Sequence, residues 1–144
     1  GGSRSATVSL GGTNNTPCIN DFTYGNAATI IGHTSVTGAA GTVKLTSANA
    51  INAAGQSTDV YSGTLDLNGQ ASVRSAQVRL LSGSSSSLIN GNTSSAASTA
   101  ANIALTSGAT IGGAGNLTLS GVISGSAGTT KIGSGTFTLT NNNT

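Results

Sequence analysis

Two residues of this chain, Cys18 and His33, have side chains that could act together as a nucleophile and its general base. In such a pair the imidazole removes the thiol proton, and a third polar group orients the imidazole. The sequence offers no orienting group near either residue, and a lone cysteine is more often a small buried residue or a free thiol. We therefore predict no catalytic nucleophile. An intermolecular contact through Cys18 remains an alternative, whereas an internal disulfide is excluded because the chain has one cysteine.

Acidic side chains are the second candidate for chemistry, since two carboxylates on neighbouring strands could act as acid and base in polysaccharide cleavage. Asp59 and Asp66 lie close together in the sequence, with Tyr61 between them, and the whole chain has three acidic residues. Asp66 occupies a position at which similar segments carry Ser, Lys, Arg, Ala or Thr, so we expect an ordinary outward-facing residue. So few carboxylates predict that the chain is not an enzyme.

Glycine-rich segments could suggest a phosphate or metal site. Gly113-Ala-Gly115 and Gly133-Ser-Gly135 do not open a helix, however, and so are typical of turns. The segment 112–116 lacks the repeated Asp that a calcium-binding array of Gly-Gly repeats requires. The sequence therefore predicts no cofactor and no metal.

Alternating threonines near the end of the chain, Thr136-Phe-Thr138-Leu-Thr140, resemble the outward Thr-x-Thr pairs of an ice-binding surface. Such a surface must repeat on every strand. The positions that appear equivalent in other segments are Ser9, Lys44, Arg79 and Thr118. This mixture argues against ice binding.

The composition limits the function classes further. The 144 residues make one domain, and Gly, Ser and Thr number 22 each. Charged residues are 6%, with a net charge of +2, and the five cations are scattered, which disfavours nucleic acid. No apolar run is long enough to span a membrane. The chain starts at Gly1 without a targeting segment, which indicates a mature or excised piece.

A short motif recurs along the chain: a small residue, a polar residue, then two apolar residues separated by any residue. The copies begin at positions 6, 28, 41, 63, 76, 101, 115 and 135, and the copy at 28 is degenerate. Between some copies lies an Ile-Asn pair, at 19–20, 51–52 and 89–90. Each copy alternates apolar and polar residues with period two and is followed by turn-forming residues, which predicts short half-buried strands.

Regularly spaced strands without helices favour an all-β, right-handed parallel β-helix of roughly four to seven coils over an open sheet. An all-β sandwich is the alternative. Coils of about 20 and of about 35 residues both fit the spacing. Stacking at 35 residues predicts two inward ladders, the first of Val8, Val43, Val78 and Leu117 and the second of Ile30, Leu65, Ile103 and Phe137.

The C-terminal third carries the most specific motif. Ser120-Gly-Val-Ile-Ser-Gly125 is followed by Lys131-Ile-Gly-Ser-Gly-Thr-Phe-Thr-Leu139, and Gly63-Thr-Leu-Asp-Leu-Asn-Gly69 carries a related signature. These runs resemble the autotransporter-associated β-strand repeat, strongly over about a quarter of the chain and loosely over 41–144. The resemblance implies a right-handed parallel β-helix in the passenger region of a secreted or surface protein of a Gram-negative bacterium.

We therefore predict an N-terminal part, 1–40, with a cap-like loop at 11–27, and a repeat solenoid at 41–144. The predicted function is structural: a stalk, an adhesin body or a self-assembling extracellular filament subunit. Its partners would be other copies meeting end to end, or surface and matrix components. The alternative is a carbohydrate-binding or carbohydrate-active β-helix protein, with Phe22, Tyr24 and Tyr61 as the aromatic contacts.

Overall fold

The computed structural model describes residues 7–10, 29–31, 41–51, 57–61, 63–81 and 86–143 of the chain, the first segment and 29–30 as backbone alone. Every regular element in these ranges is a strand, and all strand pairs are parallel. Short strands form here because apolar and polar residues alternate and each run ends at Gly, Ser, Asn or Thr.

The strands form three sheets. Sheet A consists, in spatial order, of β1 (Thr7–Leu10), β3 (Thr42–Leu45), β5 (Gly63–Asp66), β7 (Ser86–Ile89), β10 (Ala109–Gly112) and β13 (Thr129–Ile132). Sheet B consists of β2 (Thr29–Ile31), β4 (Ser57–Val60), β6 (Gln77–Leu80), β9 (Asn102–Leu105) and β12 (Ile123–Gly125). Sheet C consists of β8 (Ala97–Thr99), β11 (Leu117–Leu119) and β14 (Phe137–Leu139).

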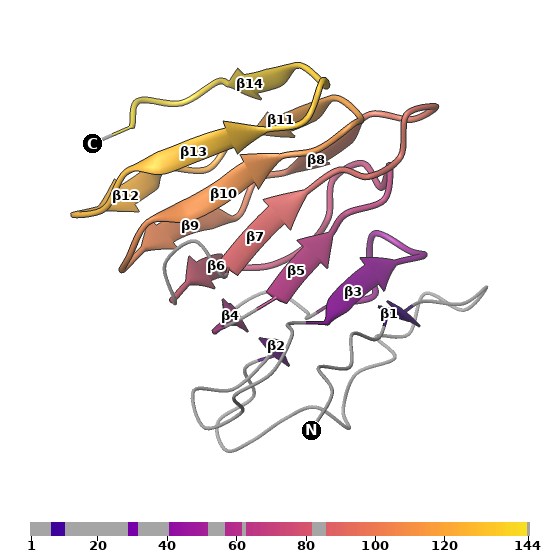
Figure 1. The fold of residues 1–144 in the computed structure, drawn as a ribbon, viewed down its shortest axis with the longest axis horizontal. Helices are drawn as coiled ribbons and strands as arrows, with labels where there is room; N and C mark the ends of the chain where they lie inside the picture. The colour runs from indigo at the N-terminus through magenta and orange to yellow at the C-terminus, as the bar shows by residue number, and fades with distance from the viewer. Residues whose placement is uncertain are drawn as a thin grey trace, which may run out of the picture.

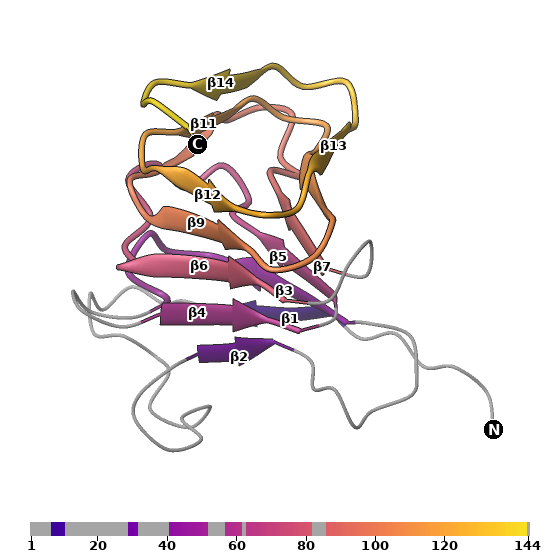
Figure 2. The ribbon, with the colours of Figure 1, turned by 90° about the vertical axis from the view of Figure 1, so that its left-hand side faces the viewer.

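The chain passes from sheet B to sheet A to sheet C and back to sheet B, and so climbs as a right-handed coil (Figures 1 and 2). This arrangement is a parallel β-helix, and it confirms the predicted fold class. With about 4.8 Å between neighbouring strands, the six strands of sheet A give a stack about 24 Å high.

Coil length is the feature that the sequence left open. Strand partners are 20 residues apart in the upper coils, as Thr110 and Thr130 show. They are 23 apart between Ser87 and Thr110, and 35 apart only between Thr7 and Thr42. The coils therefore have about 20 to 25 residues wherever β5 and later strands are involved.

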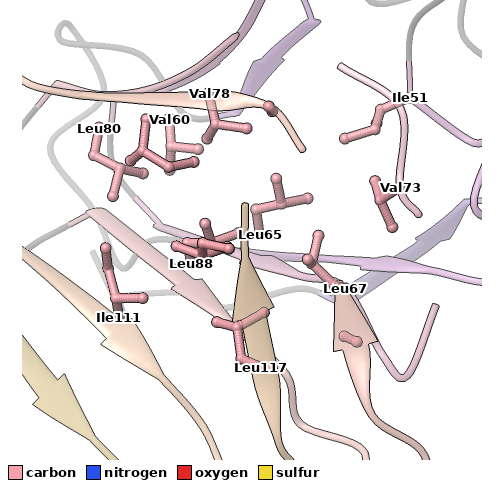
Figure 3. Packing of buried hydrophobic residues seen from close by; sticks show 14 of the residues in the cluster. Ile51, Val60, Leu65, Leu67, Val73, Val78, Leu80, Leu88, Ile111 and Leu117 are labelled. Atoms are coloured by element: carbon pink, nitrogen blue, oxygen red, sulfur yellow. The ribbon is translucent and has the colours of Figure 1, made fainter. Parts of the chain in front are cut away.

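The interior is filled by inward-facing apolar residues of the strands and of the turns between them (Figure 3). Leu65, Leu88 and Ile111 stack in sheet A, and all three are fully buried. Facing them in sheet B are Val78 and Ile103, which also stack on each other. Almost every strand thus places at least one apolar residue in the interior. Because these residues stack from coil to coil, a chain with few large apolar residues still forms a continuous core.

The two predicted ladders are wrong in their composition. Val8 and Val43 do pair, but Val43 continues to Leu65 rather than to Val78. Val78 and Ile103 belong to sheet B, whereas Leu117 and Phe137 belong to sheet C.

Ile30 pairs with Asp59, not with Leu65. The physical reason is that the motif serves all three sheets, so copies 35 residues apart usually lie on different faces. The actual columns include Val43–Leu65–Leu88–Ile111 in sheet A, Thr58–Val78–Ile103–Ile123 in sheet B and Ala97–Leu117–Phe137 in sheet C.

The described part of 41–144 forms one uninterrupted stack, and β1 and β2 continue sheets A and B below it. The predicted cap-like loop at 11–27 lies outside the described residues, as do Cys18, His33, Phe22 and Tyr24.

Candidate functional site

The two acidic residues singled out in the sequence lie on different sheets. Asp59 is in β4 of sheet B, and Asp66 ends β5 of sheet A. Each carboxylate already accepts hydrogen bonds from other groups, so the structure does not bring them together as an acid and base pair. Both are nearly buried, at 3% and 6% exposure. Asp66 was expected to be an ordinary outward-facing residue. It does lie in the outward register of sheet A, between Lys44 and Ile89, but its side chain is nearly buried and accepts two backbone hydrogen bonds.

Asp59 forms an ion pair with Arg79 of the neighbouring coil, which is its register partner in β6. The Arg79 Nε donates to Oδ1 of Asp59 at 2.6 Å, and Nη2 donates to Oδ2. The hydrogen bond to Asp59 is the main reason that the pKa of Arg79 is raised above its ordinary value; the charges of Asp59 and Tyr61 add to this, while burial opposes it. This bidentate pair ties two coils of sheet B together.

Asp66 acts at the turn that leads from sheet A to sheet C. Its Oδ1 accepts the backbone N–H of Asn68 at 2.8 Å, within its own coil, and that of Gly91 at 2.8 Å, in the next coil. Asn68 has a positive φ of 48°, which Asn tolerates better than most residues. Its amide donates to the carbonyl of Leu45 at 2.8 Å, one coil below. The turn after β5 therefore contacts the coils on both sides.

Asn90 occupies the same turn one coil higher and is fully buried. Its Oδ1 accepts the N–H groups of Gly69, at 2.8 Å, and of Asn92, at 3.1 Å. Its Nδ2 donates to the carbonyls of Ser95, at 2.9 Å, and of Asn116, at 2.8 Å. Both amide protons and both acceptor sites are thus used, and the partners come from three successive coils.

Above Asn90 the turn has no side chains at the equivalent positions. A Cβ atom on Gly113 would overlap with the carbonyl oxygen of Asn90, and one on Gly133 would overlap with that of Gly113. Gly115 and Gly135 are related in the same way: a Cβ on Gly135 would meet the Gly115 carbonyl oxygen. The two Gly-x-Gly segments are therefore turns, as predicted, and they stack directly on each other, 20 residues apart.

We call this set the corner ladder; it comprises Asp66, Asn68, Gly69, Asn90, Gly91, Asn92, Gly113, Gly115, Gly133 and Gly135. Its polar groups are backbone amides and carbonyls, three asparagine side chains and one carboxylate, and they bond to one another and to the backbone of adjacent residues. Such an arrangement fixes the register between coils. It was missed in the sequence, although the Ile89-Asn90 pair followed by Gly91 was the available signal.

A groove of about 530 Å³ lies where sheet C leads to sheet B. It is lined by the segments 72–76 and 98–101 together with Ser120, and Arg74 is its charged residue. The Val73–Thr99 bridge and the bond from Thr99 Oγ1 to the Val73 carbonyl, at 2.8 Å, form its floor. Tyr61 follows β4 at the opposite edge of sheet B, so the groove and this tyrosine do not form one site.

Within the ranges that the structure describes, no three His, Cys, Asp or Glu residues gather as metal ligands. In the same ranges, no helix is long and apolar enough to cross a membrane.

Comparison with protein-family models, curated proteins and solved structures finds no match to this chain. The resemblance to the autotransporter-associated repeat therefore stays a prediction from the sequence motifs.

Proposed function

We propose that this chain is a structural β-solenoid segment of a secreted or cell-surface bacterial protein, serving as a stalk, an adhesin body or a filament subunit. The observation that carries the proposal is the corner ladder. Its asparagine and aspartate side chains form hydrogen bonds between successive coils, and its glycines let the backbones of successive coils approach closely. The sequence resemblance to passenger repeats supports the extracellular setting.

The columns of the core support the same proposal. Every described strand of sheet A from β3 to β10 is paired on both edges, and its inward side chain stacks on an equivalent one above or below. Stability in such an array comes from each coil's own contacts and those with its neighbours. Coils of this kind form a spacer whose length scales with their number.

The uppermost described coil offers surfaces on which a further coil can stack. Sheets A, B and C end at β13, β12 and β14, which have no described strand on their outer edges. Leu139 is 43% exposed there, although its register partner Leu119 is fully buried. A coil with unpaired strand edges accepts another parallel coil, and the low charge of the chain gives little repulsion.

The filament form of the proposal is tested by light scattering and negative-stain electron microscopy over a concentration series. We expect the chain to form filaments with rising concentration. Leu139→Lys places a charge in the stacking column and should abolish them. Ser124→Lys, on the outer side of β12 in the same coil, is the matched control and should leave them intact. Single particles at every concentration would reject the filament subunit and leave the stalk segment.

The alternative is carbohydrate binding, and one observation favours it: Tyr61 is half-buried and directly follows β4, two residues after Asp59, so the period-two alternation places it on the same outer face. An aromatic ring on the same face as a paired arginine and carboxylate has the groups that a sugar site uses. Glycan-array binding that is selective, and that Tyr61→Ala removes, would support this function. The absence of any selective binding would reject it.

A further inference from the structure

The outer face of sheet C carries hydroxyl groups in register from coil to coil. Ser98, Thr118 and Thr138 are direct strand partners and form its central column. The flanking outward positions of the two upper coils are Asn116 with Thr136, and Ser120 with Thr140. Backbone bonds from Leu117 to the Thr136 carbonyl and from Thr140 to the Leu119 carbonyl extend the register over all of them.

The argument that disfavoured an ice-binding surface in the sequence does not hold in the structure. It compared Ser9, Lys44, Arg79 and Thr118 as equivalent outward positions. Ser9 and Lys44 are partners in sheet A, Arg79 belongs to sheet B, and Thr118 belongs to sheet C. The mixture of residue types thus came from three different faces. Within sheet C alone, the central column is hydroxyl throughout.

The spacing of this array is set by the backbone. Neighbouring coils are about 4.8 Å apart, and outward residues two positions apart along a strand are separated by about 6.6 Å. Across the described residues, the hydroxyls of Thr118, Thr136, Thr138 and Thr140 make no hydrogen bond to the protein. Thr136, Thr138 and Thr140 are also exposed. Each therefore presents a free hydroxyl and a methyl group at a fixed lattice point.

We propose that the outer face of sheet C binds ice, through the lattice of hydroxyl and methyl groups of Thr118, Thr136, Thr138 and Thr140. Ser98 continues the column below them, but its hydroxyl accepts the N–H of Ser72 at 2.8 Å. The chemistry that selects this ligand is the combination of a two-dimensional repeat with uncharged hydrogen-bonding groups. Ordered water in hexagonal ice repeats at distances similar to both spacings of the array. The threonine methyl groups between the hydroxyls favour ordered water over bulk water, because apolar groups restrict the orientation of neighbouring water molecules.

A polysaccharide is the competing ligand for a hydroxyl surface. Sugar rings are commonly held by aromatic side chains, which stack on their apolar faces. The outward residues of β8, β11 and β14, and the outward residues that flank these strands, include no aromatic and no charged side chain. The surface therefore suits a lattice of small molecules better than a sugar chain.

Sheet A provides an internal comparison. It also has an outward hydroxyl column, formed by Thr42, Thr64, Ser87, Thr110 and Thr130. Its second outward column is mixed, however, since Lys44, Asp66, Ile89 and Gly112 follow one another. Ser87 and Thr110 are also hydrogen-bonded to each other, with their hydroxyl oxygens 2.5 Å apart. One column without a second gives no two-dimensional lattice, so sheet A should not bind ice.

The test uses the whole 144-residue chain and two substitutions in the same coil. Thr138→Lys puts a long cation at the centre of the sheet C lattice, and Thr130→Lys puts the same residue on the outer face of sheet A. Both positions are exposed, so circular dichroism and thermal unfolding should show that both variants fold. The measured quantities are inhibition of ice recrystallisation and incorporation into a growing ice hemisphere.

We expect the unsubstituted chain and Thr130→Lys to inhibit recrystallisation at similar concentrations, and Thr138→Lys to need at least tenfold more. Ala100→Thr adds a hydroxyl beside Ser120 and should lower the required concentration severalfold. The proposal is overturned if the unsubstituted chain shows no inhibition and no incorporation into ice, or if the two lysine variants lose activity equally. Binding to microcrystalline cellulose or chitin without ice activity would also overturn it, in favour of a polysaccharide.

Discussion

The corner between sheets A and C is built in two ways along the same solenoid. In the lower coils the side chains of Asp66, Asn68 and Asn90 bridge successive turns by hydrogen bonds. In the upper coils, Gly113 and Gly133 let one backbone rest directly on the next. The same sharp turn is therefore stabilised by side-chain hydrogen bonds in the lower coils and by direct stacking of glycine backbones in the upper coils.

The two solutions differ in the chain length that they need. From Ser87 to Ala97 the chain takes ten residues to pass from sheet A to sheet C, whereas from Thr110 to Leu117 it takes seven. The interval from sheet C to the next strand of sheet A is the same in both coils. The whole change from a 23-residue to a 20-residue spacing therefore lies in this corner. A side-chain bridge needs a wider turn to enclose it, and a glycine turn does not.

The largest expected effect comes from adding one methyl group to the glycine corner. In Gly115→Ala the new Cβ overlaps with the carbonyl oxygen of Asn92 and comes within 2.6 Å of Nδ2 of Asn90. We expect a loss of more than about 3 kcal/mol in the free energy of unfolding, measured by denaturant titration, since the backbone must move. Gly128→Ala is the control, because nothing lies within 4 Å of its Cβ position. Equal losses in both variants would refute direct stacking.

The next effect tests the side-chain corner. Asn90→Ala removes four hydrogen bonds and leaves the N–H of Gly69 without its acceptor, whereas the carbonyl of Asn116 keeps the N–H of Ala97. Buried polar groups without partners predict a loss of about 2 to 4 kcal/mol in the same assay. Asn102→Ala is the matched control: its exposed side chain accepts one bond, from Val122 N at 3.0 Å, so a loss below about 1 kcal/mol is expected.

A combined variant tests whether the two corners are interchangeable. Replacing Asn90 and Asn92 by Gly and deleting residues 93–95 gives the turn between β7 and β8 the length and glycine positions of the turn between β10 and β11. We expect this variant to be more stable than Asn90→Gly alone by about 1 to 2 kcal/mol, because a shorter loop needs no amide bridge. If the deletion instead adds to the loss, the lower coils need the bridge for a further reason.

The smallest effect concerns the ion pair on sheet B, away from the corner. Arg79→Ala leaves the carboxylate of Asp59, whose side chain is 4% exposed, without its partner, and a loss of about 1 to 2 kcal/mol is expected. Arg74→Ala changes an exposed arginine at the groove and should cost less than about 0.5 kcal/mol. A double-mutant cycle with Asp59→Asn measures the coupling. Coupling near zero would mean that this ion pair does not help to hold the coils in register.

The sequence predicted local features of this fold well. Leu65, Val78, Ile103 and Leu117 were all expected to face inward, and all are buried. The period-two alternation determines which side of a strand faces the core whatever lies above it. The Gly-x-Gly segments were expected to be turns for a similarly local reason, since glycine adopts the positive φ of 114° at Gly113 without strain.

The candidate site was harder to predict because its residues act across coils. Asp66 was expected to face outward as an ordinary residue; it does face outward, but Gly91 of the next coil covers its carboxylate and donates a hydrogen bond to it. The role of Asn90 depends on Gly69 and Asn116, which lie 21 and 26 residues away. Both sets of contacts join different coils, so the residues of a single repeat do not predict them. The sequence therefore showed the Ile-Asn pair but not the hydrogen bonds that Asn90 makes.

The sequence by itself determined that this chain forms short, turn-punctuated strands with one apolar side and very little charge. The tertiary structure decided which strand lies on which. Local alternation is the same in every copy of the motif and so cannot distinguish three sheets. Which strands pair depends on the number of residues in the turn at each corner. That number is larger where asparagine and aspartate side chains bridge the turn and smaller where glycines let the backbones stack directly.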